Sequence, residues 1–244
     1  MTPRVAVVTF PGSLDDRDAL RAVRFMGGEP VSVWHAEDDL GDADAVVLPG
    51  GFSYGDYLRA GAIARFAPAM AAVARFAEEG GPILGICNGF QILCEAGLLP
   101  GALIRNRGLA FVCRRISVRA EDSSGNRTKF RSGEVLQVPI KHGEGQFVVS
   151  AGELQRLEDE GRIAFRYCAP DGRLDGQFNP NGSAAAIAGV WDDRGNVLGM
   201  MPHPEHAVDP DTGPTGGQAV FEWLFAAALR HRAERTPISE PALP

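Results

Sequence analysis

The sequence predicts an α/β fold with a mostly parallel central sheet flanked by helices, and an antiparallel β excursion in the middle of the chain. Two observations carry this prediction. In the first hundred residues, short and uniformly apolar runs alternate with segments of helical period, which is typical of parallel strands covered on both faces. From residue 111 to about 149 the pattern changes to strands and turns.

The first α/β units are visible as apolar runs that end in glycine or proline. The run RVAVVTF is followed by Ser13 and Asp16, the pattern of a helix cap, and then by apolar residues at helical spacing. Pro68 favours the first turn of a second helix. The predicted elements are strands at residues 4–10, 31–36, 43–51 and 82–87, with helices after Ser13, from Pro68 and after Cys87.

The second half of the chain predicts further strands and one more helix. Apolar runs indicate a strand at 162–169 and two strands within 184–201, joined by an Asp-Arg-Gly-Asn turn, and a polar hairpin is expected near 120–130. A buried stripe from Val220 to Ala228 predicts the final helix. We interpret residues 1–230 as a single domain and residues 231–244 as a C-terminal tail.

The composition excludes several classes of function. The chain has 244 residues, a formal net charge of −7 and a pI near 5.3, so we expect no general binding to nucleic acid or anionic membranes. No apolar run is long enough for a secretory signal or a membrane span, which favours a cytoplasmic protein. Cys87, Cys94, Cys113 and Cys168 lack CxxC spacing and predict free thiols.

Cys87 lies where the apolar run GPILGIC meets residues at helical spacing. A strand that turns directly into a helix at G-x-C-x-G is typical of a nucleophile elbow, which exposes the side chain at the carboxyl edge of the sheet. We expect the flanking Gly85 and Gly89 to let the backbone turn tightly there. The helix N-terminus there lowers the pKa of a thiol. The alternative is a core cysteine with small neighbours, because cysteine is among the most buried residue types. Cys94, on the apolar face of the same helix, is predicted to be such a packing residue.

A cysteine nucleophile needs a base, and His203 in GMMPHPEH is the best candidate. The prolines on either side are expected to hold this segment extended, so that His203 and Glu205 project to the same side and the carboxylate orients the imidazole. One alternative is a loop histidine that caps a strand. Another is a metal site of His203, Glu205, His206 and Asp209, although no second cluster completes a known ligand spacing.

The remaining histidines are weaker candidates. His142 precedes glycine in PIKHGEGQF and could line a site. His35 follows a β run and could simply end a strand. His231 lies among arginines of the last helix, where we expect it to be solvated.

Acyl transfer also needs donors for an oxyanion. Gly50 and Gly51 follow a predicted strand in LPGGFSYGDYLRAG, and glycine lets backbone N–H groups approach a substrate oxygen closely. Together with the N–H of Asn88, this glycine pair could form a two-donor site. The alternative is an ordinary turn between strand and helix, because Gly-Gly pairs are common there.

Three segments together resemble the class I, or triad-type, glutamine amidotransferases: GICNGFQ, PHPE and PGGFSYGDYLRAG. Within that family the chain is most similar to the glutaminase subunits of phosphoribosylformylglycinamidine synthase, which also carry segments like PIKHGEGQF and FNPNGS. The resemblance runs from about Val5 to Phe225. The family commonly has arginine where this chain has His206, and the tail after Arg235 is not covered.

The resemblance implies hydrolysis of glutamine to glutamate through a cysteinyl thioester. It also implies a large ATP-dependent synthetase partner, which uses the ammonia to convert formylglycinamide ribonucleotide to formylglycinamidine ribonucleotide, and in many bacteria a small third subunit. ATP and magnesium are expected on the synthetase, and no cofactor or metal on this chain, which lacks a G-x-x-x-x-G-K-[ST] loop. By this resemblance, Cys87 is the nucleophile, His203 is the base and Glu205 is the carboxylate that orients it. The backbone of Gly50, Gly51 and Asn88 binds the oxyanion or the substrate. Gln91 contacts the bound glutamine.

Two other interpretations keep part of this pattern. A cysteine hydrolase or amidase on a similar sheet would retain the thiol, but the late H-P-E segment disfavours it. A regulatory subunit without turnover would retain the fold, but the complete set of Cys87, His203 and Glu205 argues against it.

Arginines and one lysine gather between Arg105 and Arg131, against only Glu121 and Asp122. In an acidic chain this is a locally basic strip. It is either a solvated hairpin or a surface that faces the partner.

Overall fold

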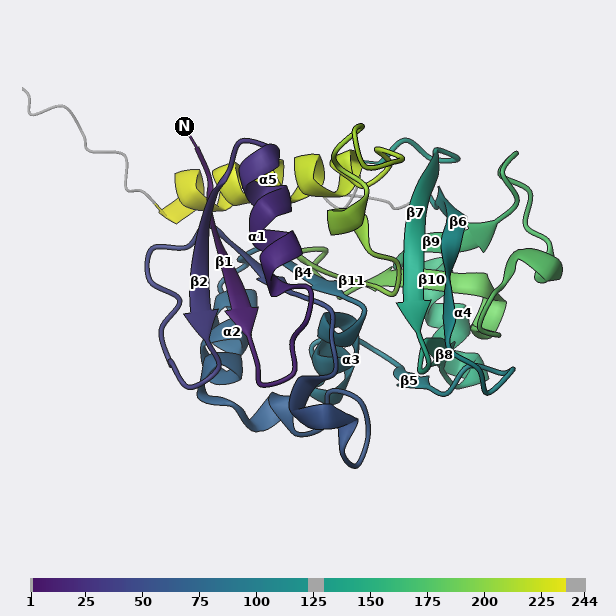
Figure 1. Cartoon of the computed structure of the whole chain (residues 1–244), viewed down its shortest axis with the longest axis horizontal. Coiled ribbons are helices and arrows are strands. Elements are labelled where there is room, and N and C mark those ends of the chain that lie inside the picture. Colours follow the sequence, from purple (N-terminus) through teal and green to yellow (C-terminus); the bar gives the residue numbers. More distant parts are fainter. Residues whose placement is uncertain (1, 123–129, 236–244) are drawn as a thin grey trace, which may run out of the picture.

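A nine-stranded sheet with the strand order β2-β1-β3-β4-β11-β10-β9-β6-β7 forms the centre of the molecule (Figure 1). The computed structural model describes residues 2–122 and 130–235. One half of the sheet is parallel and consists of β1 (Arg4–Thr9), β2 (Glu29–Trp34), β3 (Ala45–Leu48), β4 (Ile83–Ile86) and β11 (Val197–Met200). The antiparallel half consists of β6 (Val112–Ala120), β7 (Val135–His142), β9 (Ile163–Cys168) and β10 (Ile187–Trp191). The predicted fold class is confirmed, and the antiparallel excursion continues the same sheet.

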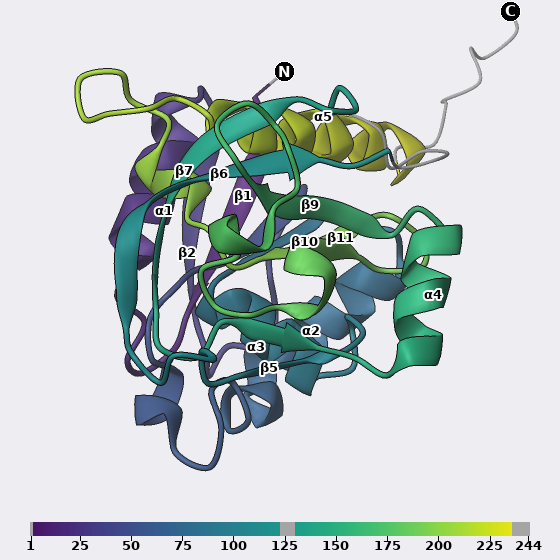
Figure 2. The same ribbon diagram turned by 90° about the vertical axis from the view of Figure 1, so that its right-hand side faces the viewer.

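Within the described residues, five α-helices surround the sheet. Figure 2 shows α5 on one side of strands β10 and β11, with α2 and α3 on the other side. A small second sheet pairs β5 (Ala102–Ile104) with β8 (Gln146–Val148). The helices are α1 (Asp16–Phe25), α2 (Pro68–Glu78), α3 (Asn88–Glu95), α4 (Ala151–Asp159) and α5 (Gln218–Arg235).

The apolar runs that predicted the strands form the core. Every residue of β3, β4 and β11 is buried, as expected for parallel strands covered on both faces. Trp191 of β10 meets Trp223 of α5 edge to face, with ring centroids 4.9 Å apart. This packing covers the amino end of β11, since Trp191 pairs with Leu198 there.

Two local predictions are wrong. Ser13 does not cap α1: its hydroxyl accepts from the Phe10 N–H at 3.0 Å, because the helix begins only after Asp15. His231 is buried rather than solvated, since it lies on the inner face of α5, where its ring centroid is 5.1 Å from that of Phe76. Neighbouring arginines therefore say little about the face on which a helical residue lies.

Two predictions reach the residues that the structure does not describe. Most of the expected hairpin at 120–130 falls in 123–129, which lies outside the described residues. The division into a domain of residues 1–230 and a tail stays a prediction: α5 continues to Arg235, and residues 236–244 lie outside the description. Among the described helices, none combines the length and the apolar character needed to cross a membrane.

Candidate active site

Loops at the carboxyl ends of the parallel strands bring the candidate residues together. Gly51 follows β3, Cys87 follows β4 and His203 follows β11. A cavity of about 310 Å³ lies at this edge, and Gly51, Cys87, Gln91, Lys141 and His142 contribute to its lining. Ligands of open α/β sheets ordinarily bind at this edge.

Cys87 is the turning point between β4 and α3. Its backbone has φ 51° and ψ −102°, a sparsely populated conformation that costs a non-glycine residue about 1–3 kcal/mol. The flanking glycines, expected to supply the turn, instead allow close packing. A Cβ on Gly89 would overlap the carbonyl oxygen of Leu48, and a Cβ on Gly85 would lie 2.9 Å from the Gly89 backbone. The strain of the elbow therefore falls on the candidate nucleophile itself.

The two cysteines of this segment have different surroundings. Cys87 is 5% exposed, lines the cavity, and its Sγ lies 3.9 Å from the backbone carbonyl oxygen of Lys141. Cys94 packs with its Sγ 3.5 Å from the carbonyl oxygen of Pro100. Burial, together with Glu95, raises the pKa of the Cys94 thiol well above its ordinary value. Only Cys87 is therefore placed as a nucleophile, and the packing position predicted for Cys94 is confirmed.

His203 and Glu205 form a buried pair. Nδ1 of His203 lies 2.6 Å from Oε1 of Glu205, and neither side chain is exposed. The expected pairing occurs, but the expected extended chain does not. Pro204 begins a short 3₁₀ helix, Pro204–His206, because proline favours the first position of a helix.

The environment of His203 favours its protonated form. Burial alone would lower its pKa, but the Glu205 carboxylate and the Cys87 sulfur together raise it well above the ordinary value for histidine. Its Nε2 is buried and has no hydrogen-bond partner among the described residues. The imidazole is thus oriented on one nitrogen and open on the other, as a base requires.

Asp15 and Lys141 were not predicted from the sequence, yet they complete this cluster. Asp15 is 3% exposed, and its Oδ1 accepts a hydrogen bond from Nζ of Lys141 and lies 3.2 Å from Nε2 of His206. Burial would raise the pKa of Asp15, but His206, His203 and Lys141 outweigh it and hold the pKa well below its ordinary value. The only signal in the sequence was the position of Asp15 in the turn after the first strand.

The metal alternative changes its members in the structure. Ligand atoms of Asp15, His203, Glu205 and His206 lie within 4.8 Å of one another. Asp209, expected in that set, is instead near Arg21, at 3.8 Å. Lys141 forms an ion pair with Asp15, and Glu205 is hydrogen-bonded to His203. We therefore interpret the cluster as an ion-pair network rather than as a metal site.

The two glycines after β3 lie in different places. An isolated bridge between Ser13 and Gly51 uses the N–H groups of Leu14 and Phe52, which leaves the Gly51 N–H out of the bridge, beside the cavity. Asn88 is the first residue of α3, where backbone N–H groups have no partner within the helix. Gly50, in contrast, packs beside His203: a Cβ there would lie 2.8 Å from Cε1 of the imidazole.

Gln91 and Asn88 connect the walls of the cavity. The Asn88 side chain donates to Oε1 of Gln91 at 2.9 Å and accepts from the Ser53 N–H at 3.2 Å. Gln91 in turn donates to the carbonyl oxygen of Glu144 at 2.6 Å. Asp56 lies on the same wall, and burial with the nearby Glu144 raises its pKa to about 6.

His142 lines the cavity, as the sequence suggested, but it is placed as a neutral structural group. Its Nδ1 lies 3.1 Å from Oδ1 of Asn106. Burial and the nearby His203 lower its pKa to about 4. The segment FNPNGS holds the loop that follows His142. The side chains of Asn181 and Ser183 both donate to the Gly145 carbonyl oxygen, at 2.7 and 3.3 Å.

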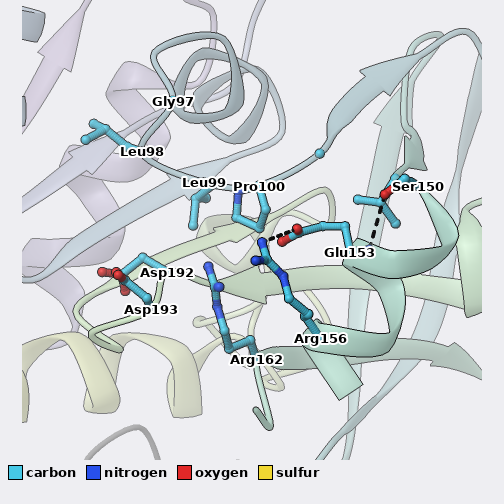
Figure 3. A pocket seen from close by; sticks show the side chains of 12 residues that line it. Gly97, Leu98, Leu99, Pro100, Ser150, Glu153, Arg156, Arg162, Asp192 and Asp193 are labelled. Atoms are coloured by element: carbon cyan, nitrogen blue, oxygen red, sulfur yellow. Dashed lines mark hydrogen bonds and ion pairs between the residues drawn. The ribbon is translucent and has the colours of Figure 1, made fainter. Parts of the chain in front are cut away.

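A larger cavity, of about 580 Å³, lies away from these residues. Figure 3 shows Arg156 and Arg162 on one side of it, Leu99 and Pro100 on another, and Arg156 paired with Glu153. None of the candidate catalytic residues lines it. Size alone therefore does not identify the site.

Comparisons with known proteins match almost the whole chain. A family model of the CobB/CobQ-like glutamine amidotransferase domain matches residues 2–224. The phosphoribosylformylglycinamidine synthase subunit PurQ of Corynebacterium jeikeium is 60% identical over 231 residues, covering 94% of this chain and 100% of that protein. The same subunit of Gloeobacter violaceus is 54% identical, covering 93% of this chain and 98% of that protein. A chain from the structure of PurLQS of Thermotoga maritima is 41% identical, with a TM-score of 0.81, covering 93% of this chain and 99% of that chain.

Proposed function

The chain belongs to the family of CobB/CobQ-like glutamine amidotransferase domains, and we propose that it is the glutaminase subunit of a phosphoribosylformylglycinamidine synthase. The relatives that carry this name support the proposal, since they match the chain over nearly its full length. The resemblance drawn from GICNGFQ, PHPE and PGGFSYGDYLRAG is thereby confirmed at the level of the family.

One observation carries the catalytic part of the proposal: Cys87 lies on a strained elbow, at the cavity, beside a buried His203–Glu205 pair. The Cys87 thiolate attacks the side-chain amide carbon of glutamine and forms an Sγ–C bond. The carbonyl electrons move to oxygen, and the N–H groups of Gly51 and Asn88 stabilise that oxyanion. Glu205 holds the imidazole of His203 in register throughout.

Collapse of the tetrahedral intermediate releases ammonia. The C–N bond breaks while protonated His203 gives its proton to the leaving nitrogen, which leaves a glutamyl thioester on Cys87. The neutral imidazole then takes a proton from water, and the resulting hydroxide attacks the thioester carbon. The C–S bond breaks, glutamate leaves, and Cys87 regains the thiolate.

The charges around the cavity suit the zwitterion of a free amino acid. Asp56 and Glu144 give one wall a negative character, while Arg105 lies 3.7 Å from Glu144. The α-ammonium group of glutamine pairs with the acidic wall, and its α-carboxylate pairs with the arginine. Asp56 supports this assignment, because burial and the nearby Glu144 raise its pKa and make its charged form costly unless a cation pairs with it.

Ammonia released here serves a second reaction on another subunit. The partner is a large synthetase, which carries ATP and magnesium and aminates formylglycinamide ribonucleotide to formylglycinamidine ribonucleotide, together with a small third subunit. The match to a chain from a PurLQS structure supports such an assembly. The complex works in the cytoplasm, without nucleic-acid or membrane partners, and this chain contributes no cofactor of its own.

Two assays on the assembled complex test the proposal. Cys87→Ala should abolish glutamine-dependent synthesis while ammonia-dependent synthesis survives. Because the members of a triad act as a unit, the loss should span orders of magnitude. Cys94→Ala is the matched control and should keep both activities. Glutamine-dependent synthesis at a near wild-type rate in Cys87→Ala would refute the assignment of Cys87 as the nucleophile.

A further inference from the structure

Asp15 is a buried carboxylate beside the candidate base that the proposed reaction leaves unused. It precedes the first residue of α1, where an aspartate ordinarily accepts from helix N–H groups and so stabilises the helix. The Asp15 side chain makes no such capping bond. Its oxygens contact Lys141 and His206 instead. A favourable local interaction is therefore given up for contacts inside the site.

Two carboxylates share the same edge of one imidazole. Oε1 of Glu205 lies 2.6 Å from Nδ1 of His203, and Oδ2 of Asp15 lies 3.7 Å from the same nitrogen. The other oxygen of Asp15 is held by Lys141 and by His206. Asp15 thus has a fixed position, and it is not a counterion of Lys141 alone.

The backbone opposite Asp15 is shaped for this approach. A Cβ on Gly50 would overlap Oδ2 of Asp15 and lie 2.8 Å from Cε1 of His203. The N–H groups of Leu14 and Asp15 both donate to the Gly50 carbonyl, at 3.1 and 3.2 Å. The loop after β3 therefore fixes the backbone of Asp15 and leaves room for its side chain beside the imidazole.

We propose that Asp15 is a positioning residue for the Cys87–His203 pair: with Glu205 it holds the imidazole and stabilises its protonated form, and it anchors Lys141 beside the nucleophile. The carbonyl oxygen of Lys141 lies 3.9 Å from Sγ of Cys87, so the residue that Asp15 holds by its ammonium group touches the thiol through its backbone. The inference rests on the proposed function, because it assigns Asp15 to the same nucleophile and base.

The charges around His203 have a defined arrangement. Glu205 and His206 approach from the 3₁₀ helix, Asp15 from the turn before α1, Lys141 and His142 from β7, and Cys87 from the elbow. Burial would lower the pKa of Lys141, but Asp15, Glu205 and Cys87 together raise it. The Asp15–Lys141 pair thus has its negative end at the imidazole, while its positive end interacts with the sulfur. Both ends favour the transfer of a proton from Cys87 to His203.

The test measures that proton transfer directly. Asp15→Asn removes the charge with little change in shape, and Asp16→Asn, in the first turn of α1, is the matched control. The rate of Cys87 alkylation by iodoacetamide is followed against pH on the folded chain, with the modified Cys87 peptide identified by mass spectrometry. In Asp15→Asn the pH midpoint of Cys87 alkylation should rise by about one unit. At pH values below that midpoint, the variant should therefore react about tenfold more slowly than the wild type. Asp16→Asn should keep the wild-type midpoint, and Asp15→Glu should recover part of the loss.

The outcomes separate this inference from the proposed function. If Cys87 is required for glutaminase activity but a folded Asp15→Asn keeps the wild-type alkylation midpoint, Asp15 has no positioning role. If Asp15→Asn does not fold, the double variant Asp15→Asn/Lys141→Met replaces both charged partners and leaves no unpaired charge. Its alkylation midpoint should still be raised. A wild-type alkylation midpoint in this double variant also rejects the inference. If Cys87 is dispensable for glutaminase activity, the proposed function itself fails.

Discussion

Nδ1 of His203 lies 2.6 Å from Oε1 of Glu205, with both side chains fully buried. A buried charge without its partner is costly, so the carboxylate and the imidazole depend on each other for charge as well as for orientation. Removal of the charge of Glu205 should therefore act on catalysis even when the shape of the site is kept.

Glu205→Gln should lower kcat for glutamine hydrolysis by about 10²–10⁴-fold, because the amide no longer stabilises the imidazolium and can select the wrong tautomer. The measurement is steady-state glutaminase activity of the assembled complex. Glu222→Gln, on the exposed face of α5, removes the same charge and should keep full activity. A Glu205→Gln complex within twofold of the wild-type rate would exclude an orienting role for this residue.

Gly50 should tolerate no side chain, for reasons of packing beside His203. Gly50→Ala places a Cβ 2.8 Å from Cε1 of His203 and in overlap with Asp15, and displacement of a catalytic group by about 1 Å costs on the order of 10²-fold in rate. Gly152→Ala, in open space at the start of α4, is the control and should be neutral. Equal activity of the two variants in a glutaminase assay would show that the space at Gly50 is not needed.

Asp56 should bind the ammonium group of glutamine. Loss of a charge-assisted contact is worth about 1.5–3 kcal/mol, so Asp56→Asn should raise KM for glutamine by roughly 10–100-fold with a smaller change in kcat. Glu134→Gln, in the turn before β7, is the control. An unchanged KM in Asp56→Asn would remove this carboxylate from the substrate site.

The same residue should make the free subunit less stable at neutral pH. The folded state raises the pKa of Asp56 from 3.8 to about 6, mainly through burial. Because the folded chain then binds the proton more tightly than the unfolded chain, this group reduces stability as pH rises from about 4 to 6, and the cost persists above pH 6. Asp56→Asn should therefore melt higher than wild type at pH 7.5, and the gain should shrink towards pH 4. A melting temperature below that of the wild type at pH 7.5 would show that the Asp56 carboxylate does not destabilise the folded chain.

The basic strip stays a prediction, and two of its arginines line the same cavity. Arg105 pairs with Glu144, and Arg119 pairs with Glu121. Arg114 and Arg115 form no ion pair within residues 2–122 and 130–235, and both line a cavity of about 410 Å³ on the antiparallel half of the sheet. If this surface faces the synthetase, Arg114→Glu/Arg115→Glu should weaken assembly at least about tenfold.

The binding measurement for the strip is titration with the synthetase at low and moderate salt. The wild-type affinity should fall with salt more steeply than that of the double variant. Arg17→Glu, an exposed position on α1, serves as the control. An unchanged affinity of Arg114→Glu/Arg115→Glu for the synthetase would indicate that the strip is a solvated surface.

Local patterns in the sequence predicted what local physics decides. The strands are continuous apolar runs, the elbow at Cys87 follows from a strand that meets a helix, and the pairing of His203 with Glu205 needs only two residues of separation. The conformations were less well predicted. The turn at Cys87 is made by the cysteine rather than its glycines, and the P-H-P-E segment bends into a 3₁₀ helix.

The rest of the site depends on distant parts of the chain. Asp15 meets Lys141 across 126 positions and His206 across 191. Neither contact leaves a periodic or motif signal, because each arises from loops that the sheet brings to one edge. Ser13, Asp15 and Asp16 all resemble cap residues in sequence, and only the fold shows that Asp15 turns to the active site.

Intact-protein and peptide mass spectrometry of the assembled complex, quenched in acid during glutamine turnover, tests the role of Cys87 as the nucleophile most directly. A glutamyl thioester on Cys87 is predicted: the mass of glutamine less ammonia on the Cys87 peptide, absent in Cys87→Ala and sensitive to hydroxylamine. Hydrolysis of glutamine that continues in Cys87→Ala, or an adduct on Cys94, Cys113 or Cys168 instead, would contradict the role of Cys87 as the nucleophile.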